Sequence, residues 1–269
     1  MDPARLAAAD ARIRAEQPYI TSLLVVRGGD IVFEQYYGGF TATDATQIWS
    51  ATKSVTSTLV GIAIDEGRLT LDQTVGELLP DRLPAGADPR AATVTVRQLL
   101  TMTSGFAWAS STDFQYAFDQ VDLTARTLGL PFACDPGTCY EYNSGNVQVL
   151  SSILEARTGQ TLAAYAQARL FDPLGIAPPV WERGVTGETL GAVGLHLTSR
   201  DFAKLGFLFL NGGVWDGQQI VSRAWVEAAT APQSSGTGTK GINLGLASYG
   251  YLWWTNQVGG LPAYFGLGL

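Results

Sequence analysis

The sequence is poor in the residues on which metal sites and histidine-based catalysis depend. Its 269 residues include one histidine, two cysteines and three lysines. A zinc site needs several ligands, and one histidine with two closely spaced cysteines does not supply them. No Gly-x-Ser-x-Gly pattern accompanies His196, so a serine–histidine–aspartate triad is not indicated either. We therefore expect no metal and no cofactor, and we interpret His196 as a packed residue.

Positive charge and long apolar runs are also scarce. The formal net charge is −7, which argues against a surface that binds nucleic acid or anionic membranes. No run approaches the roughly 20 apolar residues of a membrane span. Residues 1–5 lack the basic and apolar regions of a signal peptide, so we expect either a cytoplasmic chain or the mature form of an exported protein. Small-molecule substrates fit this composition, and the sequence gives no indication of oligomeric state.

The two cysteines, Cys134 and Cys139, bound the short segment Cys-Asp-Pro-Gly-Thr-Cys. This spacing fits a small disulfide loop and fits two free thiols equally well. Two cysteines do not identify a redox compartment. The sequence leaves both alternatives open.

The sequence does contain strand patterns at both ends and helix patterns between them. Hydrophobic residues make up 46% of the chain, enough for the core of one large domain. Strands are predicted over 22–27, 31–37 and 249–256, and helices over 3–16, 50–65, 94–101, 144–158, 160–170, 199–210 and 222–230. This order predicts an α+β fold, with one antiparallel sheet assembled from N- and C-terminal strands around a mostly helical region. Because the chain stops directly after one late strand, we expect C-terminal strands of that sheet to be missing.

Ser50 and Lys53 open one of the predicted helices, three residues apart. At this spacing the two side chains share a helix face, so the amine can reach the hydroxyl. A serine hydroxyl is a weak nucleophile until a base takes its proton, and a lysine becomes that base when burial lowers its pKa. With three lysines and fifteen serines in the chain, about 0.2 such pairs are expected by chance. The spacing alone therefore also fits the solvated first turn of an ordinary helix.

A second candidate, Tyr142, begins the segment Tyr142-Asn143-Ser144, between a Pro-Gly turn and a predicted helix. Side chains project into a cleft more readily from such a turn than from the middle of a helix. A phenol beside a lysine amine can be held as phenolate or can relay a proton to a leaving group. The alternative is that Tyr142 is a core aromatic residue and that Ser144 only caps the helix.

Several motifs in the same order resemble those of one family. Residues 48–67, which contain Ser50-Ala-Thr-Lys53, resemble the nucleophile helix of the class C β-lactamase-related, penicillin-recognising serine hydrolases. Residues 136–145, which contain Tyr142, resemble that family's tyrosine motif. Connecting segments are also similar, at residues 99–105, 194–201 and 210–213. The resemblance extends over nearly the whole chain.

This resemblance implies a β-lactamase/transpeptidase-like fold in a single domain, residues 1–269, with a helical insertion at about 68–200. It also implies acylation of Ser50, with Lys53 and Tyr142 as general base and acid, followed by hydrolysis of the acyl-enzyme. The family includes β-lactamases, D-specific peptidases, esterases and hydrolases of 6-aminohexanoate oligomers. Ser144 stands where the β-lactamase form carries asparagine, and this favours the esterase and oligomer-hydrolase side.

The substrate is therefore expected to be a small ester, amide or lactam. Ser144, Trp108 and Trp181 are candidates for binding it, and its identity is expected to depend on the loops at 106–140 and 230–248.

One motif of the family is not found. It is a Lys-Thr-Gly or His-x-Gly strand that donates one N–H of the oxyanion hole. Residues 264–268 lie where it should begin, and they contain neither lysine nor histidine. A non-catalytic relative or an inert fragment of the same fold is therefore the competing hypothesis, and a D-peptidase or β-lactamase is a third.

Overall fold

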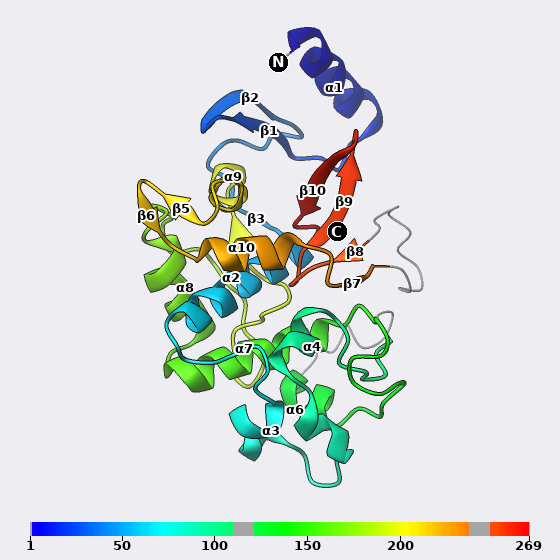
Figure 1. Ribbon diagram of the computed structural model, residues 1–269. Helices are drawn as coiled ribbons and strands as arrows, with labels where there is room; N and C mark the ends of the chain where they lie inside the picture. Colours follow the sequence, from blue (N-terminus) through cyan, green and yellow to red (C-terminus); the bar gives the residue numbers. More distant parts are fainter. Residues whose placement is uncertain (1, 110–120, 237–247, 269) are drawn as a thin grey trace.

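The computed structural model describes residues 2–109, 121–236 and 248–268. Helix α1 (Pro3–Glu16) and the hairpin of β1 (Ser22–Arg27) and β2 (Asp30–Tyr36) stand at one end of the molecule (Figure 1). The other elements follow in chain order: β3 (Thr46–Gln47), η1 (Trp49–Ala51), α2 (Thr52–Asp65), α3 (Val75–Leu78), η2 (Pro80–Arg82), η3 (Pro89–Thr93), α4 (Val96–Leu100), α6 (Leu123–Leu128), α7 (Ser144–Thr158), α8 (Leu162–Ala166), η5 (Gln167–Phe171), β4 (His196–Leu197), α9 (Ser199–Leu210), β5 (Val214–Trp215), β6 (Gln218–Gln219), α10 (Arg223–Thr230), β7 (Ser234–Ser235), β8 (Ser248–Tyr249), β9 (Trp254–Val258) and β10 (Leu261–Phe265).

Two helices, α2 and α7, form the centre of the core. Every residue of α2 from Thr52 to Ala63 is buried, and Lys53 is the one charged residue among them. A helix that is apolar or small on all sides is stable only when other elements surround it, and here α7, α9 and α10 lie around α2 (Figure 1). Helix α7 is capped by the Asn143 side chain and ends at Gly159, whose positive φ of 70° suits glycine. The pairing of α2 with α7 fixes the distance between the Ser50 and Tyr142 segments.

The strands form separate antiparallel sheets. β1 pairs with β2, and the C-terminal strands pair in the order β10-β9-β8-β7. The α+β class with small antiparallel sheets is as predicted, but the described N- and C-terminal strands do not hydrogen-bond to each other in one sheet. Strands β1 and β10 both contribute residues to the lining of a groove of about 780 Å³ instead of pairing with each other. This groove also reaches Trp49 and Ala51, on either side of Ser50.

Most of the predicted helices are confirmed, with differences at their ends. The segment 160–170 divides into α8 and a π-helical turn. The predicted strand over 249–256 is interrupted at Leu252, whose φ is 60°, so that β9 begins only at Trp254. Helix α6 and strand β10 had no counterpart in the sequence prediction. Residues 110–120 and 237–247, which belong to the loops expected to set specificity, lie outside the described residues.

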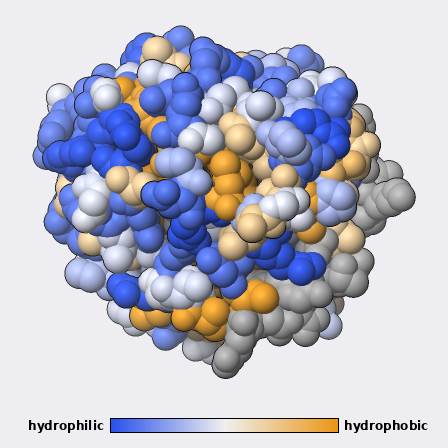
Figure 2. Space-filling model, turned by 90° about the horizontal axis from the view of Figure 1, so that it is seen from below, coloured by the Kyte–Doolittle hydropathy of each residue, from blue (hydrophilic) through white to orange (hydrophobic). Residues whose placement is uncertain are grey.

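The surface at the helical end of the molecule is mostly hydrophilic, with apolar residues in small groups (Figure 2). None of the helices in the described ranges has the length and apolar character needed to span a bilayer.

Candidate active site

Ser50 lies in the 3₁₀ turn η1, directly before α2. The preceding residue, Trp49, has a φ of 48°, which is a left-handed conformation that side-chain-bearing residues rarely adopt. Such backbone strain persists only where the surrounding structure enforces it, and it concentrates at functional sites. Here the strained turn presents Ser50 at the edge of the core, half-buried between the fully buried Ala51 and the exposed Trp49.

Lys53 is buried in the first turn of α2 with its amine directed at Ser50. Its Nζ lies 2.8 Å from Ser50 Oγ and 3.2 Å from the carbonyl oxygen of Ala192. Only 1% of Lys53 is exposed. Burial disfavours the ammonium form and lowers the pKa of Lys53 to about 7. A substantial fraction of the amine is therefore neutral at physiological pH, as a general base requires.

Tyr142, in the segment before α7, is the third residue that contacts Ser50 and Lys53. Its side chain is hydrogen-bonded to that of Ser50, and its ring centroid lies 5.0 Å from Lys53 Nζ. Burial raises the pKa of Tyr142 to about 12, an effect that the hydrogen bond with Ser50 only partly offsets. The phenol is thus neutral at pH 7, which fits a proton relay or acid better than a phenolate.

Two aromatic residues from the C-terminal sheet hold the Tyr142 ring. Trp254 stacks on it with centroids 5.6 Å apart, and Tyr249 packs edge-on at 6.2 Å. Trp254 and Tyr249 also pack against each other. The sequence analysis only placed these two residues in the strand predicted over 249–256, because contacts between residues so far apart in the chain leave no local pattern.

Backbone strain is concentrated around this group. The described residues include four non-glycine positions with positive φ, and three of them flank the site. These three are Trp49, Leu252 and Met102. The carbonyl of Leu252 accepts a hydrogen bond from Ser54, and Met102 accepts hydrogen bonds from the backbone N–H groups of Glu141 and Asn143, on either side of Tyr142. The sequence carried no signal for this strain.

The described interactions of the other residues predicted for the site are with other parts of the structure. Ser144 is buried as the first residue of α7, but Asn143 rather than Ser144 caps the helix, because the Asn143 side chain accepts the backbone N–H of Asn146. Trp108 packs with Leu123 in a small second core cluster. Trp181 donates its indole N–H to the carbonyl of Leu190 (2.8 Å) and lines a separate pocket of about 230 Å³. None of the three belongs to the hydrogen-bonded group of Ser50, Lys53 and Tyr142.

The single histidine is engaged in a polar contact of its own. His196 Nε2 lies 3.0 Å from Glu182 Oε1, which also accepts a hydrogen bond from Gln47. Within the described ranges, no three histidine, cysteine or carboxylate side chains come together in a group that could hold a metal ion.

Cys134 and Cys139 form a disulfide, which decides between the two alternatives left open by the sequence. The loop that it closes is tied to residues 103–105, where Gly137 N–H bonds to the carbonyl of Thr103 and Ala133 N–H to that of Gly105. Tyr142 follows this loop after two residues. The disulfide therefore stiffens the segment that delivers Tyr142.

The strand β10 reaches the beginning of α2. A side chain at Gly266 would lie 3.2 Å from Ser54 Oγ, and one at Gly268 would lie 2.2 Å from the carbonyl oxygen of Ile48. The segment with neither lysine nor histidine therefore packs beside the nucleophile turn, where only glycine leaves room.

Three features of this arrangement are those of nucleophilic catalysis: a hydroxyl on a strained turn, an amine with lowered pKa beside it, and a neutral phenol bonded to the hydroxyl. The arrangement can move a proton from Ser50 to Lys53 and return one through Tyr142.

Comparison with known proteins places the chain in a family. Residues 14–268 match the family model described as Beta-lactamase. The 6-aminohexanoate-dimer hydrolase of Paenarthrobacter ureafaciens is 30% identical, over 91% of this chain and 66% of the relative. Esterase EstB of Burkholderia gladioli is 29% identical, over 65% of this chain and 52% of the relative. The chain thus spans about half to two thirds of the length of these curated relatives.

Among solved structures, the octameric penicillin-binding protein homologue from Pyrococcus abyssi superposes with a TM-score of 0.77 at 20% identity. The match covers 98% of this chain and 67% of that one. At this identity the likeness concerns the fold alone.

Proposed function

Because the chain belongs to the beta-lactamase family, we propose that it is a serine hydrolase that cleaves carboxylic ester or amide bonds through an acyl-enzyme on Ser50. The observation that carries this proposal is the 2.8 Å contact between Ser50 Oγ and the buried amine of Lys53. The named relatives include a hydrolase of the 6-aminohexanoate dimer and an esterase. Their activities belong to longer chains and come to this one as part of the proposal.

In the acylation step, the neutral amine of Lys53 takes the proton of Ser50 while Oγ forms a bond to the carbonyl carbon of the substrate. The tetrahedral intermediate collapses when the bond to the leaving group breaks. The departing alcohol or amine takes a proton from the Tyr142 phenol, and the proton that Lys53 took from Ser50 returns to the phenolate oxygen, which leaves the amine neutral again. Water then attacks the acyl-enzyme with the same two groups acting in the reverse sense.

The surroundings of Ser50 favour an apolar acyl group over an anionic one. The groove that reaches Trp49 and Ala51, on either side of Ser50, is lined mainly by apolar side chains, among them those of Leu197, Phe202 and Trp253. Lys53, the cation that contacts Ser50, is used as the base and is fully buried. Neutral esters and amides with apolar acyl chains are therefore the proposed substrate class.

A fluorophosphonate probe tests the nucleophile directly. We expect the probe to form an adduct on Ser50, located by peptide mass spectrometry, and to form none in Ser50→Ala. Ser54→Ala is the matched control, because Ser54 is a buried serine one turn along, bonded to the carbonyl of Leu252. Labelling should also accelerate as pH rises through about 7, because only neutral Lys53 accepts the proton. An adduct on another serine, or no adduct, would refute the proposed mechanism and favour a non-catalytic relative.

A further inference from the structure

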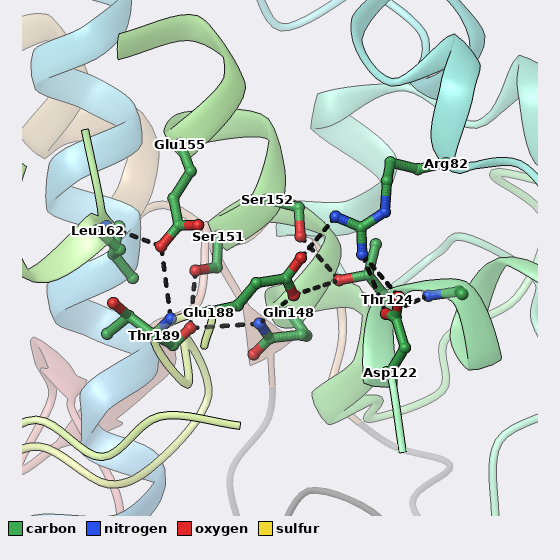
Figure 3. Close-up of polar contacts among 11 residues, drawn as sticks. Arg82, Asp122, Thr124, Gln148, Ser151, Ser152, Glu155, Leu162, Glu188 and Thr189 are labelled. Atoms are coloured by element: carbon green, nitrogen blue, oxygen red, sulfur yellow. Dashed lines mark hydrogen bonds and ion pairs between the residues drawn. The ribbon is translucent and has the colours of Figure 1, made fainter. Parts of the chain in front are cut away.

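The second hydrogen-bond partner of the Lys53 amine is the carbonyl of Ala192. This residue belongs to a segment that is hydrogen-bonded to side chains of both α2 and α7. Side chains hydrogen-bond to the backbone of this segment, residues 188–192, from Thr189 to Ala192, and Figure 3 shows the contacts at Thr189. The Ser151 hydroxyl donates to the carbonyl of Thr189 (2.9 Å), and the Trp181 indole donates to that of Leu190 (2.8 Å). The position of the Ala192 carbonyl is therefore set by the residues before it.

Gly191, directly before Ala192, is held at both of its backbone polar groups. Thr56 of α2 donates its hydroxyl to the Gly191 carbonyl (2.7 Å), and the Gly191 N–H donates to Oε1 of Gln148 on α7 (3.1 Å). A side chain at Gly191 would lie 2.8 Å from the carbonyl oxygen of Val147, so glycine allows the backbone to approach α7 this closely. Thr56 and Gln148 are both buried, and neither contacts Ser50.

The orientation of the Gln148 side-chain amide is fixed by the hydrogen bonds that its nitrogen donates. Its Nε2 donates to the carbonyl of Thr189 (3.2 Å) and to Oε2 of Glu188 (3.3 Å). Glu188 is anchored by an ion pair with Arg82 and by the hydroxyl of Thr124, as Figure 3 shows. The amide nitrogen of Gln148 faces two acceptors, and the amide oxygen faces the Gly191 N–H. Because a flipped amide would lose these bonds, a single orientation satisfies all three partners.

We propose that Gln148 and Thr56 are positioning residues that act on Lys53 through the Gly191–Ala192 backbone. By holding the Ala192 carbonyl 3.2 Å from Nζ, they give one N–H of the neutral amine a fixed acceptor. The amine can rotate about its last carbon–nitrogen bond, and this contact selects the rotation that directs its lone pair at Ser50. The catalytic consequence rests on the proposed function, whereas the effect on the amine does not.

The protonation of Lys53 reports on this contact independently of catalysis. Ser50 and Tyr142 are the titratable or nucleophilic side chains whose contacts with Nζ are described above, and burial is the cause of the lowered pKa. The Ala192 carbonyl stabilises the ammonium form as a buried acceptor. Loosening it should therefore lower the pKa of Lys53 further.

The experiment is an NMR titration of protein labelled with carbon-13 at lysine Cε. The chain has three lysines, so Lys53 is assigned by one substitution. We expect the midpoint of Lys53 to fall by about 0.5–1 pH unit in Gln148→Met and in Thr56→Val. Thr56→Ser, which keeps the hydroxyl, should restore it.

Matched controls separate positioning from general packing. Thr58→Val removes a buried hydroxyl of α2 that bonds within its helix, to the carbonyl of Ser54, and Thr127→Val removes a buried hydroxyl of α6 that bonds to the carbonyl of Leu123. The midpoint should be unchanged in both controls. An unchanged or raised midpoint in Gln148→Met and Thr56→Val, or an equal shift in the controls, would overturn the proposal.

A second readout connects the inference to the reaction. At pH 9, where Lys53 is neutral in every variant, fluorophosphonate labelling of Ser50 should slow about 10-fold in Gln148→Met and Thr56→Val, and not in the controls. If the parent protein is not labelled at all, the proposed function fails, and the titration of Lys53 still decides the positioning role by itself.

Discussion

At the scale of single residues, the burial that would suit Lys53 for its proposed role as a base also lowers the folding stability of the protein. Its pKa is lowered from 10.5 to about 7 by burial. The unfolded chain therefore binds a proton that the folded chain has released between pH 7 and 10.5, and folding stability rises with pH across that window. The shift of about 3.5 pH units (10.5 minus about 7) corresponds to at most about 5 kcal/mol of destabilisation at pH 7 and below. The two hydrogen bonds of the amine offset part of it.

Replacing the amine should therefore stabilise the protein. We expect Lys53→Met to melt at a higher temperature than the parent at pH 7, because methionine fills the site without a charge. The difference in melting temperature between the variant and the parent should narrow as pH rises toward 10, where Lys53 also loses its proton in the unfolded chain. Thermal unfolding at pH 6, 8 and 10 checks both statements. A gap independent of pH would mean that Lys53 is not buried as described.

Tyr142→Phe removes a hydroxyl and keeps the ring between Lys53, Tyr249 and Trp254. If the phenol protonates the leaving group, hydrolysis of an alkyl ester should slow about 100-fold or more. A nitrophenyl ester, whose leaving group needs no proton, should be affected far less. The comparison is made by steady-state kinetics on the two esters, with the melting temperature as a control for folding. Equal losses on both esters would assign Tyr142 to another role.

The spacing of Ser50 and Lys53 predicted that the amine can reach the hydroxyl, because a helix fixes the geometry of residues three apart, although the spacing alone also fitted a solvated helix turn. Tyr142 was singled out by its place in a turn before a helix and by motif resemblance, but its distance from Ser50 could not be predicted, since that distance depends on how α7 packs on α2. The carbonyl of Ala192 and the φ of Trp49 were beyond prediction, because neither a backbone carbonyl nor a strained torsion is written in side-chain identity.

At the scale of elements, the position of α2 depends on a close approach by α10. A side chain at Gly61 would lie 2.4 Å from the indole of Trp225, which is buried and cannot move aside without disturbing the core. We expect Gly61→Ala to lower the free energy of unfolding by about 1–3 kcal/mol through overpacking. Denaturant titration measures the change.

The matched control is Gly206→Ala in α9, where an added side chain meets nothing within 4 Å. In this helix, alanine should raise stability by about 0.5–1 kcal/mol, since glycine has the poorer helix propensity. Opposite signs for the two substitutions are the expected result. If Gly61→Ala and Gly206→Ala both stabilised the protein, α10 would not be in close contact with α2 at Gly61.

Element boundaries followed local chemistry where it was strong. The sequence predicted the helices over 3–16 and 199–210 with the bounds that the structure shows. They begin directly after the capping residues Asp2 and Thr198. The pairing of β1, β9 and β10 was not predicted correctly, because a strand's partner is chosen by packing between distant segments. The division of the chain into one domain with a helical insertion at about 68–200 stays a prediction.

At the scale of the whole molecule, the β1–β2 hairpin is tied to α9 rather than to the C-terminal sheet. Glu34 of β2 forms two hydrogen bonds with Arg200 (2.7 and 2.6 Å), and the hydroxyls of Ser22 and Ser199 meet at 2.6 Å. The hydrogen bonds with Arg200 lower the pKa of Glu34 to about 2. This contribution to stability is complete above pH 4.5 and is lost as pH falls from 4.5 to 2.

Acid should therefore loosen this end of the molecule first. We expect amide hydrogens of β1 and β2 to exchange faster at pH 3 than at pH 6, relative to those of α7, after correction for intrinsic rates. In Glu34→Gln the hairpin should exchange faster already at pH 6 and change little on acidification. Hydrogen exchange followed by mass spectrometry reads both segments in one sample, and uniform loosening of α7 and the hairpin would contradict the prediction.

The burial of Lys53 also has a consequence for the engineering of this protein. A library of variants sorted only for resistance to heat would enrich chains in which residue 53 has become methionine or leucine, since these escape the ionisation penalty. Such variants would keep the fold and lose the amine proposed to act as the base. Laboratory evolution toward a heat-resistant form therefore has to sort for turnover in the same round, and an unusually high melting temperature in a natural variant is a reason to inspect position 53 first.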